Sequence, residues 1–134
     1  MATPLAQLKD VAVGLKYLHS QLVIHGDLKG VRFSGPAVSF TPALRDPRSQ
    51  LNILINKDGR ACLADFGLTR VIAEFTSSGP DKSSGTLMWM SPEVLWPEKF
   101  GYRNARPTKE SDVYSLGMVI YEVRTIFVIW LPAI

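Results

Sequence analysis

The chain has 134 residues, of which 46% are hydrophobic and 20% are charged, a content that can form a packed core and excludes wholesale disorder. Its single cysteine, Cys62, excludes an intramolecular disulfide framework and a zinc site built from cysteines. The formal net charge of +3 is too small to indicate nucleic-acid binding.

The first predicted element is an amphipathic helix over residues 4–21. Its apolar side chains recur every three or four residues, as expected for one stripe of a helix, at Leu5, Leu8, Val11, Ala12, Leu15 and Leu18. Thr3 is suited to cap this helix, and Pro4 is suited to its first turn.

The middle of the chain is predicted to contain a β-hairpin between two irregular segments. Residues 31–51 hold three prolines and no helix or strand period, which indicates a loop. Two short apolar runs, residues 53–55 and 61–64, flank an Asp58-Gly59 turn, the pattern of a hairpin. Residues 69–88 are polar and rich in Ser, Thr and Gly, which favours a mobile surface segment.

The last predicted element is a helix over residues 112–123, apolar nearly all round and therefore expected to be buried on most faces. The charge-free stretch after Arg124 has only ten residues and contains Pro132, too short to span a bilayer. The N-terminus lacks the pattern of a signal peptide, so we expect an intracellular, cytoplasmic protein with no membrane partner.

Five motifs, in order, resemble those of protein kinases. His25-Gly26-Asp27-Leu28-Lys29 resembles the catalytic loop, and Asn52-Ile53-Leu54-Ile55 resembles its end and the following strand. Asp65-Phe66-Gly67 resembles the magnesium-binding motif, and Ser91-Pro92-Glu93 resembles the close of the activation segment. Asp112 to Gly117 resembles the start of the long central helix. Each motif alone is weak, but the ordered set is specific.

The resemblance implies an α+β fold, that of the mainly helical C-lobe of a protein kinase, with one small β-hairpin. The stretch Gly85 to Met90 resembles the tyrosine-kinase-like group of serine/threonine kinases. We expect a partial kinase domain over residues 1–123, interrupted by an insertion at 31–51, and an unrelated tail at 124–134.

The resemblance also implies roles for single residues. Asp27 would accept the proton of the substrate hydroxyl, and Lys29 would contact the transferred phosphate, so these two are the candidate catalytic residues. Asn52 and Asp65 would hold Mg²⁺ that bridges the phosphates of ATP, since oxygen ligands suit this cation. The implied substrate is a protein hydroxyl.

Two further positions follow from the same resemblance. Thr86 would hydrogen-bond near the catalytic Asp27, and Asp112 would accept hydrogen bonds from backbone N–H groups of the catalytic loop. Gly26 replaces the arginine usual in protein kinases, which weakens the case for a phosphorylation switch in the 69–88 segment. Gly26 also fits small-molecule kinases of the aminoglycoside and choline type, but those lack the motifs at 85–93 and 112–117.

The chain departs from the family pattern in two respects. The family places the asparagine five residues after the catalytic aspartate, whereas Asp27 and Asn52 are 25 residues apart here. No motif of the nucleotide-binding N-lobe is present, so we expect little or no activity from the chain as it stands. A catalytically dead interaction module of kinase type is therefore the alternative function.

Overall fold

The computed structural model describes residues 3–30, 52–66 and 86–130. In chain order its elements are α1 (Pro4–Ser20), β1 (Ile53–Ile55), β2 (Ala61–Leu63), the 3₁₀ turn η3 (Thr86–Trp89), α3 (Pro92–Leu95), the 3₁₀ turn η4 (Pro97–Phe100) and α4 (Lys109–Trp130). The predicted α+β class is confirmed. The predicted 31–51 loop lies outside the described residues, as does the 69–88 segment except for its last three residues, which belong to η3.

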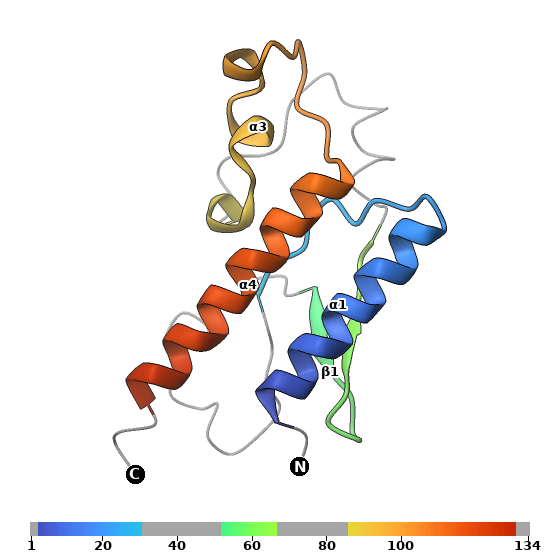
Figure 1. The fold of residues 1–134 in the computed structure, drawn as a ribbon, viewed down its shortest axis with the longest axis vertical. Coiled ribbons are helices and arrows are strands. Elements are labelled where there is room, and N and C mark those ends of the chain that lie inside the picture. Colours follow the sequence, from blue (N-terminus) through green and yellow to red (C-terminus); the bar gives the residue numbers. More distant parts are fainter. Residues whose placement is uncertain (1–2, 31–51, 67–85, 131–134) are drawn as a thin grey trace.

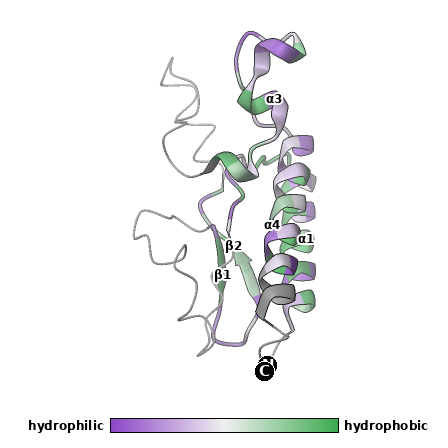
Figure 2. Ribbon diagram, turned by 90° about the vertical axis from the view of Figure 1, so that its left-hand side faces the viewer, coloured by the Kyte–Doolittle hydropathy of each residue, from purple (hydrophilic) through white to green (hydrophobic). Residues whose placement is uncertain are grey.

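The two long helices form one layer and the hairpin lies against it. Figure 1 shows α1 and α4 side by side and running in opposite directions. Figure 2, turned by 90°, shows the β1–β2 hairpin on one side of this helix pair. The buried core draws on both helices, the hairpin and the loop after α1, through Val11, Leu15, Leu28, Ile53, Val119 and Val123.

Helix α1 begins as its sequence predicts, because the Thr3 hydroxyl accepts a hydrogen bond from the backbone N–H of Ala6 at 3.3 Å. Fewer of its apolar residues are buried than predicted. The buried residues are Gln7, Val11, Leu15 and Leu18. Burial of Leu5 and Ala12 was a wrong prediction, since both are exposed. At about 100° per residue, these two lie roughly 100–120° around the helix from Val11.

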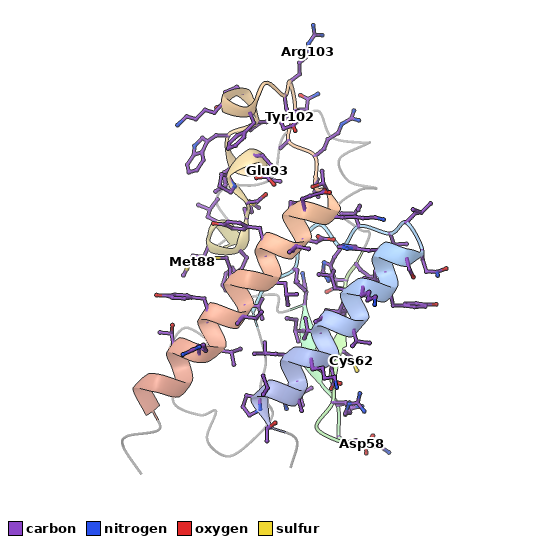
Figure 3. The ribbon with its side chains drawn as sticks, in the orientation of Figure 1. Asp58, Cys62, Met88, Glu93, Tyr102 and Arg103 are labelled. Carbon is purple, nitrogen blue, oxygen red and sulfur yellow. The ribbon has the colours of Figure 1, made fainter. Side chains whose placement is uncertain are left out.

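The predicted hairpin is confirmed. Strands β1 and β2 pair antiparallel, with Ile53 opposite Leu63, Leu54 opposite Cys62 and Ile55 opposite Ala61. The Asn56 side chain organises the turn, because its Oδ1 accepts hydrogen bonds from the backbone N–H of Asp58 at 3.0 Å and of Arg60 at 2.9 Å. Figure 3 shows Asp58 at the tip of this hairpin and Cys62 on β2.

Helix α4 begins at a reciprocal cap. The backbone N–H of Ser111 donates to the Thr108 hydroxyl at 3.1 Å, and the backbone N–H of Thr108 donates to the Ser111 hydroxyl at 2.8 Å. The helix continues to Trp130, beyond the predicted 112–123, because no proline interrupts it before Pro132. Among the described helices, none is long and apolar enough to cross a membrane.

Burial of α4 on most of its faces was a wrong prediction. Asp112, Val119 and Val123 are buried along one line, whereas exposed side chains occur on the other faces, at Val113, Tyr114, Ile120 and Tyr121. An apolar composition shows that a helix can be buried, but the neighbouring elements decide which faces are covered. Within the described chain, α1 and η3 are the elements that pack most extensively on α4.

Candidate active site

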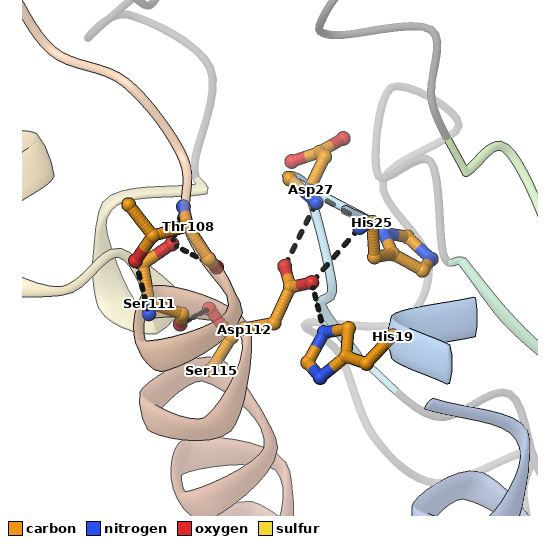
Figure 4. Close-up of polar contacts among 8 residues, drawn as sticks. His19, His25, Asp27, Thr108, Ser111, Asp112 and Ser115 are labelled. Atoms are coloured by element: carbon orange, nitrogen blue, oxygen red, sulfur yellow. Dashed lines mark hydrogen bonds and ion pairs between the residues drawn. The ribbon is translucent and has the colours of Figure 1, made fainter. Parts of the chain in front are cut away.

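The segment after α1 is held by one buried carboxylate of α4. Asp112 is 1% exposed. Its Oδ2 accepts a hydrogen bond from the backbone N–H of His25, and its Oδ1 accepts one from the backbone N–H of Gly26, both at 2.8 Å. Figure 4 shows this carboxylate between α4 and the 25–27 segment. The prediction that Asp112 accepts hydrogen bonds from the backbone of the catalytic loop is confirmed. Its two backbone partners precede it in the sequence by 87 and 86 positions.

His19 is a third partner of the same carboxylate, and sequence reasoning missed it. Its Nε2 lies 2.8 Å from Oδ2 of Asp112 and must be the donor, because an ionised carboxylate only accepts. His19 is in the last turn of α1 and outside every motif, so nothing in the sequence distinguishes it from a surface histidine. The carboxylate thus ties α1, α4 and the loop between α1 and β1 together.

Gly26 has the backbone conformation that this contact requires. Its φ is +80°, in the left-handed region, where a residue with a Cβ is strained. The conformation turns two successive N–H groups, of His25 and Gly26, toward Asp112. A glycine adopts this conformation without the strain that a side chain such as the arginine usual in protein kinases would carry.

Three of the four predicted site residues, Asp27, Lys29 and Asn52, contact one another next to the segment that Asp112 holds. The Asn52 amide donates through Nδ2 to the backbone carbonyl of Asp27 and, at 3.0 Å, to Oδ2 of its carboxylate. Nζ of Lys29 lies 2.9 Å from the same Oδ2, with the two side chains only 13% and 27% exposed. In the contacts between described residues, both side chains therefore engage the same oxygen of Asp27, Oδ2.

Backbone hydrogen bonds connect Asn52 to the segment that carries Asp27, although the two residues are 25 positions apart in the sequence. The backbone N–H of Asn52 donates to the carbonyl of Lys29 at 3.3 Å, and the carbonyl of Asn52 accepts from the N–H of Ala64 at 2.9 Å. Asn52 is 1% exposed, so this junction is interior. The described residues on either side of 31–51 therefore lie close together, and the separation along the chain does not separate Asp27 from Asn52 in space.

Within the described part of the chain, no hydrogen bond or ion pair joins Asp65 to these three residues. It follows β2 with φ at +56° and is exposed. In the described ranges, no group of three His, Cys, Asp or Glu side chains is close enough to hold a metal ion. The ring of Phe66, the next residue, has its centroid 6.5 Å from that of His25 in a tilted arrangement.

His25 is fully buried, and burial is the main influence that lowers its pKa below the ordinary 6.5, against the raising influence of Asp112. Its Nδ1 accepts from the backbone N–H of Asp27 at 3.3 Å, which favours the neutral tautomer with its proton on Nε2. As a neutral imidazole, His25 accepts a hydrogen bond from the backbone N–H of Asp27 and so helps to fix the conformation of the loop.

One buried polar atom fits the predicted magnesium site. Oδ1 of Asn52 is buried and has no hydrogen-bond partner among the described residues. Its amide is oriented by the two bonds from Nδ2 to Asp27, so this oxygen is held in place without a donor from the described part of the chain. An unpartnered amide oxygen is a suitable ligand for Mg²⁺. The side chain of Thr86, predicted near Asp27, lies outside what the structure describes.

Comparison with known proteins places these observations in a family. The protein kinase domain model matches residues 45–131, well over half of the chain. The chain belongs to the protein kinase family. The match begins inside the predicted insertion and ends beyond Val123, so the predicted domain boundaries stay predictions.

Similar curated proteins include several serine/threonine kinases. The chain is 34% identical over 116 residues to sporulation-specific protein 1 of Saccharomyces cerevisiae, covering 87% of this chain and 18% of that protein. It is 36% identical over 116 residues to a probable serine/threonine-protein kinase of Dictyostelium discoideum, covering 87% and 5%. It is 31% identical over 119 residues to human mitogen-activated protein kinase kinase kinase 3, covering 87% and 15%. The chain spans less than a fifth of each of these relatives.

Proposed function

We propose that this chain carries the catalytic loop of an ATP-dependent protein serine/threonine kinase, which transfers the γ-phosphate of ATP to a protein hydroxyl. The observation that carries the proposal is the contact of Asn52 and Lys29 with one oxygen of the Asp27 carboxylate. Phosphoryl transfer depends on positioning and charge stabilisation more than on covalent chemistry, and this cluster supplies both.

Asp27, Lys29 and Asp112 would have different roles in the transfer of the phosphate. Asp27 would accept the proton of the substrate hydroxyl at Oδ1, because Oδ2 is engaged by Lys29 and Asn52. Lys29 places a positive charge beside this base, where it would stabilise the transferred phosphate. Asp112 fixes the backbone that carries Asp27.

Magnesium and ATP fit the cluster through Asn52, whose Oδ1 is buried and has no hydrogen-bond partner among the described residues, together with the carboxylate of Asp65. When bound, Mg²⁺ neutralises phosphate charge during the transfer. The chain's own contribution is to hold the Asn52 amide by two hydrogen bonds and to keep it out of bulk water.

A catalytically dead, kinase-like interaction module is a second candidate. It is favoured by the exposed Asp65, which is not joined to Asn52 or Asp27 among the described residues. Without both ligands, a metal-bound nucleotide would not be held. We also propose an intracellular location and a protein substrate, in line with the sequence-based expectations.

Thermal unfolding with increasing Mg·ATP separates the two candidates. A kinase site binds the nucleotide, and the unfolding temperature rises with RT ln(1 + [L]/Kd). Asn52→Ala should abolish the rise, while Asp58→Asn, at the tip of the hairpin, should retain it. Transfer of labelled γ-phosphate to a mixture of Ser- and Thr-containing peptides then tests catalysis, with Asp27→Asn as the inactive control. Nucleotide binding without transfer agrees with the low activity expected of the chain as it stands, whereas no binding at all favours the interaction module.

A further inference from the structure

A surface between α3 and α4 combines exposed aromatic rings with positive charge, and it takes no part in the Asp27 cluster. Trp96, Phe100 and Tyr102 are 45%, 52% and 59% exposed. Residues 96–106 also contain three exposed cations, and Glu98 is the one acid in this range of the sequence. The 96–106 surface is defined here by six side chains: Trp96, Lys99, Phe100, Tyr102, Arg103 and Arg106.

The backbone of this surface is fixed by its own hydrogen bonds. The N–H of Lys99 donates to the carbonyl of Trp96 at 3.0 Å, and the N–H of Tyr102 donates to the carbonyl of Pro97 at 2.9 Å. Gly101 ends η4 in the left-handed conformation, with φ at +78°. Because the main chain is already ordered, binding of a partner here costs less conformational entropy than binding to an unstructured loop.

The three cations of the surface are not neutralised by carboxylates of the described chain. The ion pairs between described residues involve neither Lys99 nor Arg103 nor Arg106. Nζ of Lys99 instead lies 5.2 Å from the centroid of the Trp96 ring, a cation–π contact that keeps charge and ring together. Figure 3 shows the Arg103 side chain directed away from the body of the molecule. The surface therefore offers positive charge that the carboxylates of a partner can pair with.

The composition of the surface is typical of a site that binds protein. Aromatic residues and arginine are enriched where proteins contact one another. An acidic segment with an apolar side chain fits both features, because its carboxylates pair with the cations and its apolar group packs against the rings. A nucleic acid fits less well, since its binding depends on many phosphate contacts and the whole chain has a net charge of only +3.

The surface lies at the same end of α4 as the segment that carries Asp27. It is followed by Thr108, whose reciprocal cap with Ser111 begins α4. Asp112, the next residue of this helix, holds the two backbone N–H groups that precede Asp27. Figure 4 shows Thr108, Asp112 and Asp27 close together, so a partner held on the surface lies at the end of the helix where the transfer is proposed.

We propose that the 96–106 surface is a docking site for an acidic segment of the protein substrate. Carboxylates of that segment pair with Lys99, Arg103 and Arg106, and an apolar side chain packs against the aromatic rings. Since the segment is separate from the hydroxyl that accepts the phosphate, docking lowers KM and leaves kcat unchanged. The proposal rests on the proposed kinase function for the identity of the partner, but binding to the surface is measurable without catalysis.

Fluorescence anisotropy of a labelled peptide tests the binding step on the full chain. The probe is a short peptide of Glu and Asp residues around one Phe, and the control peptide has Gln and Asn in place of the acids. Arg103→Glu combined with Arg106→Glu reverses two charges of the surface. Lys9→Glu combined with Lys16→Glu is the matched control, because both lysines are exposed on α1 and the net charge changes equally.

We expect the acidic peptide to bind and the reversed arginine pair to weaken its affinity about tenfold, because two ion pairs are lost together. The lysine control should change the affinity less than about twofold. Arg103→Gln combined with Arg106→Gln should weaken binding in the same direction but less, and this pair replaces the reversed pair if the latter does not fold. Trp96→Ala should also weaken binding, at unchanged net charge. Binding should weaken as NaCl rises from about 50 to about 200 mM.

Three results of the binding experiment overturn the proposal. They are no binding of the acidic peptide, equal binding of the Gln and Asn peptide, and equal losses of affinity in the arginine and lysine pairs. The last would mean that the whole chain attracts the peptide by its charge and not through this surface. Tighter binding of single-stranded RNA or of anionic lipid vesicles through Arg103 and Arg106 also overturns it, because the partner would then not be a protein.

Kinetics separate this proposal from the proposed function. With a serine acceptor peptide joined to the acidic segment, the reversed arginine pair should raise KM about tenfold and leave kcat unchanged. The same acceptor without the acidic segment should have equal KM values with both chains. A change confined to kcat contradicts the docking role. A chain that binds the acidic peptide at this surface but transfers no phosphate contradicts the proposed function and leaves the docking site supported.

Discussion

At the scale of single residues, Asp112 joins parts of the chain that are distant in sequence: helix α1, helix α4 and the segment after α1. One buried carboxylate accepts hydrogen bonds from two backbone N–H groups and one imidazole. These donors would be costly to bury without an acceptor, so the carboxylate satisfies three groups at once. The motif order predicted the two backbone contacts, because Asp112 belongs to a recognisable motif. It did not predict His19, which belongs to none.

Replacement of Asp112 by asparagine should therefore be severe. An amide offers one acceptor oxygen and places an NH₂ group against at least one of the former donors. We expect Asp112→Asn to lower the free energy of unfolding by about 2–4 kcal/mol, measured by denaturant titration. Asp58→Asn, a change of the same kind at the exposed hairpin turn, should have little effect. Equal effects from the two substitutions would contradict the role given to Asp112.

His25 predicts a dependence of stability on pH. Its pKa in the folded chain is lowered, chiefly by burial, from an ordinary value of 6.5. As the pH falls below that value, the unfolded chain takes up a proton at His25 that the folded chain does not, so the free energy of unfolding decreases. The decrease levels off below the folded pKa.

The measurement is the slope of unfolding free energy against pH between pH 7.5 and pH 5, a range of about one unit or more on each side of 6.5. His25→Gln should flatten the slope relative to the unchanged chain. A variant with the same slope would show that this imidazole is protonated as easily in the folded chain as in the unfolded one.

Among elements, the hairpin and α1 were predictable because their signals are local. Asp58-Gly59 between two apolar runs specifies a turn, and Thr3-Pro4 specifies a helix start. The burial of α4 was not predictable in the same way, since apolar residues such as Val113 and Tyr114 remain exposed. Which face is covered depends on elements distant in the sequence, and periodicity does not contain that information.

Two glycines in the middle of helices provide a matched test of element packing. A Cβ at Gly117 of α4 would meet no atom of the described residues within 4 Å, whereas a Cβ at Gly14 of α1 would lie 3.3 Å from Cδ1 of Leu63 on β2. Gly117→Ala should raise the free energy of unfolding by about 0.5–1 kcal/mol through helix propensity alone. Gly14→Ala should give a smaller gain or none, because the same propensity is offset by crowding against the hairpin.

Thermal or denaturant unfolding of both variants measures the difference. If Gly14→Ala stabilises the chain as much as Gly117→Ala, then α1 does not approach the hairpin as closely as described, and the arrangement of the two layers needs revision.

At the scale of the whole molecule, the main departure from the family pattern is the distance in sequence between Asp27 and Asn52. The order of motifs predicted that both belong to one site, and the structure joins them by hydrogen bonds. Spacing alone could not have shown this, because a sequence does not reveal whether extra residues separate two groups or bulge away from them. The relation of Asp65 to the site stays a prediction.

Deletion of residues 31–50 tests this arrangement. Since the carbonyl of Lys29 already contacts the N–H of Asn52, a short connection through Gly30 and Leu51 should close without displacing either. We expect the shortened chain to fold and to gain roughly 1 kcal/mol in unfolding free energy, the entropy of the removed loop. Protection of the Asn52 amide from hydrogen exchange should persist. Loss of folding would show that the removed residues support the core.

The hydrogen bond between Lys29 and Asn52 has a practical consequence. It brings the two described residues nearest the ends of the 31–51 stretch, Lys29 and Asn52, close together in space, so a replacement segment can be joined between them. A fluorescent reporter or an affinity peptide whose own ends lie close together could be grafted there in place of the native stretch. The graft would be joined to the segment that carries Asp27 and Lys29, which contact each other directly.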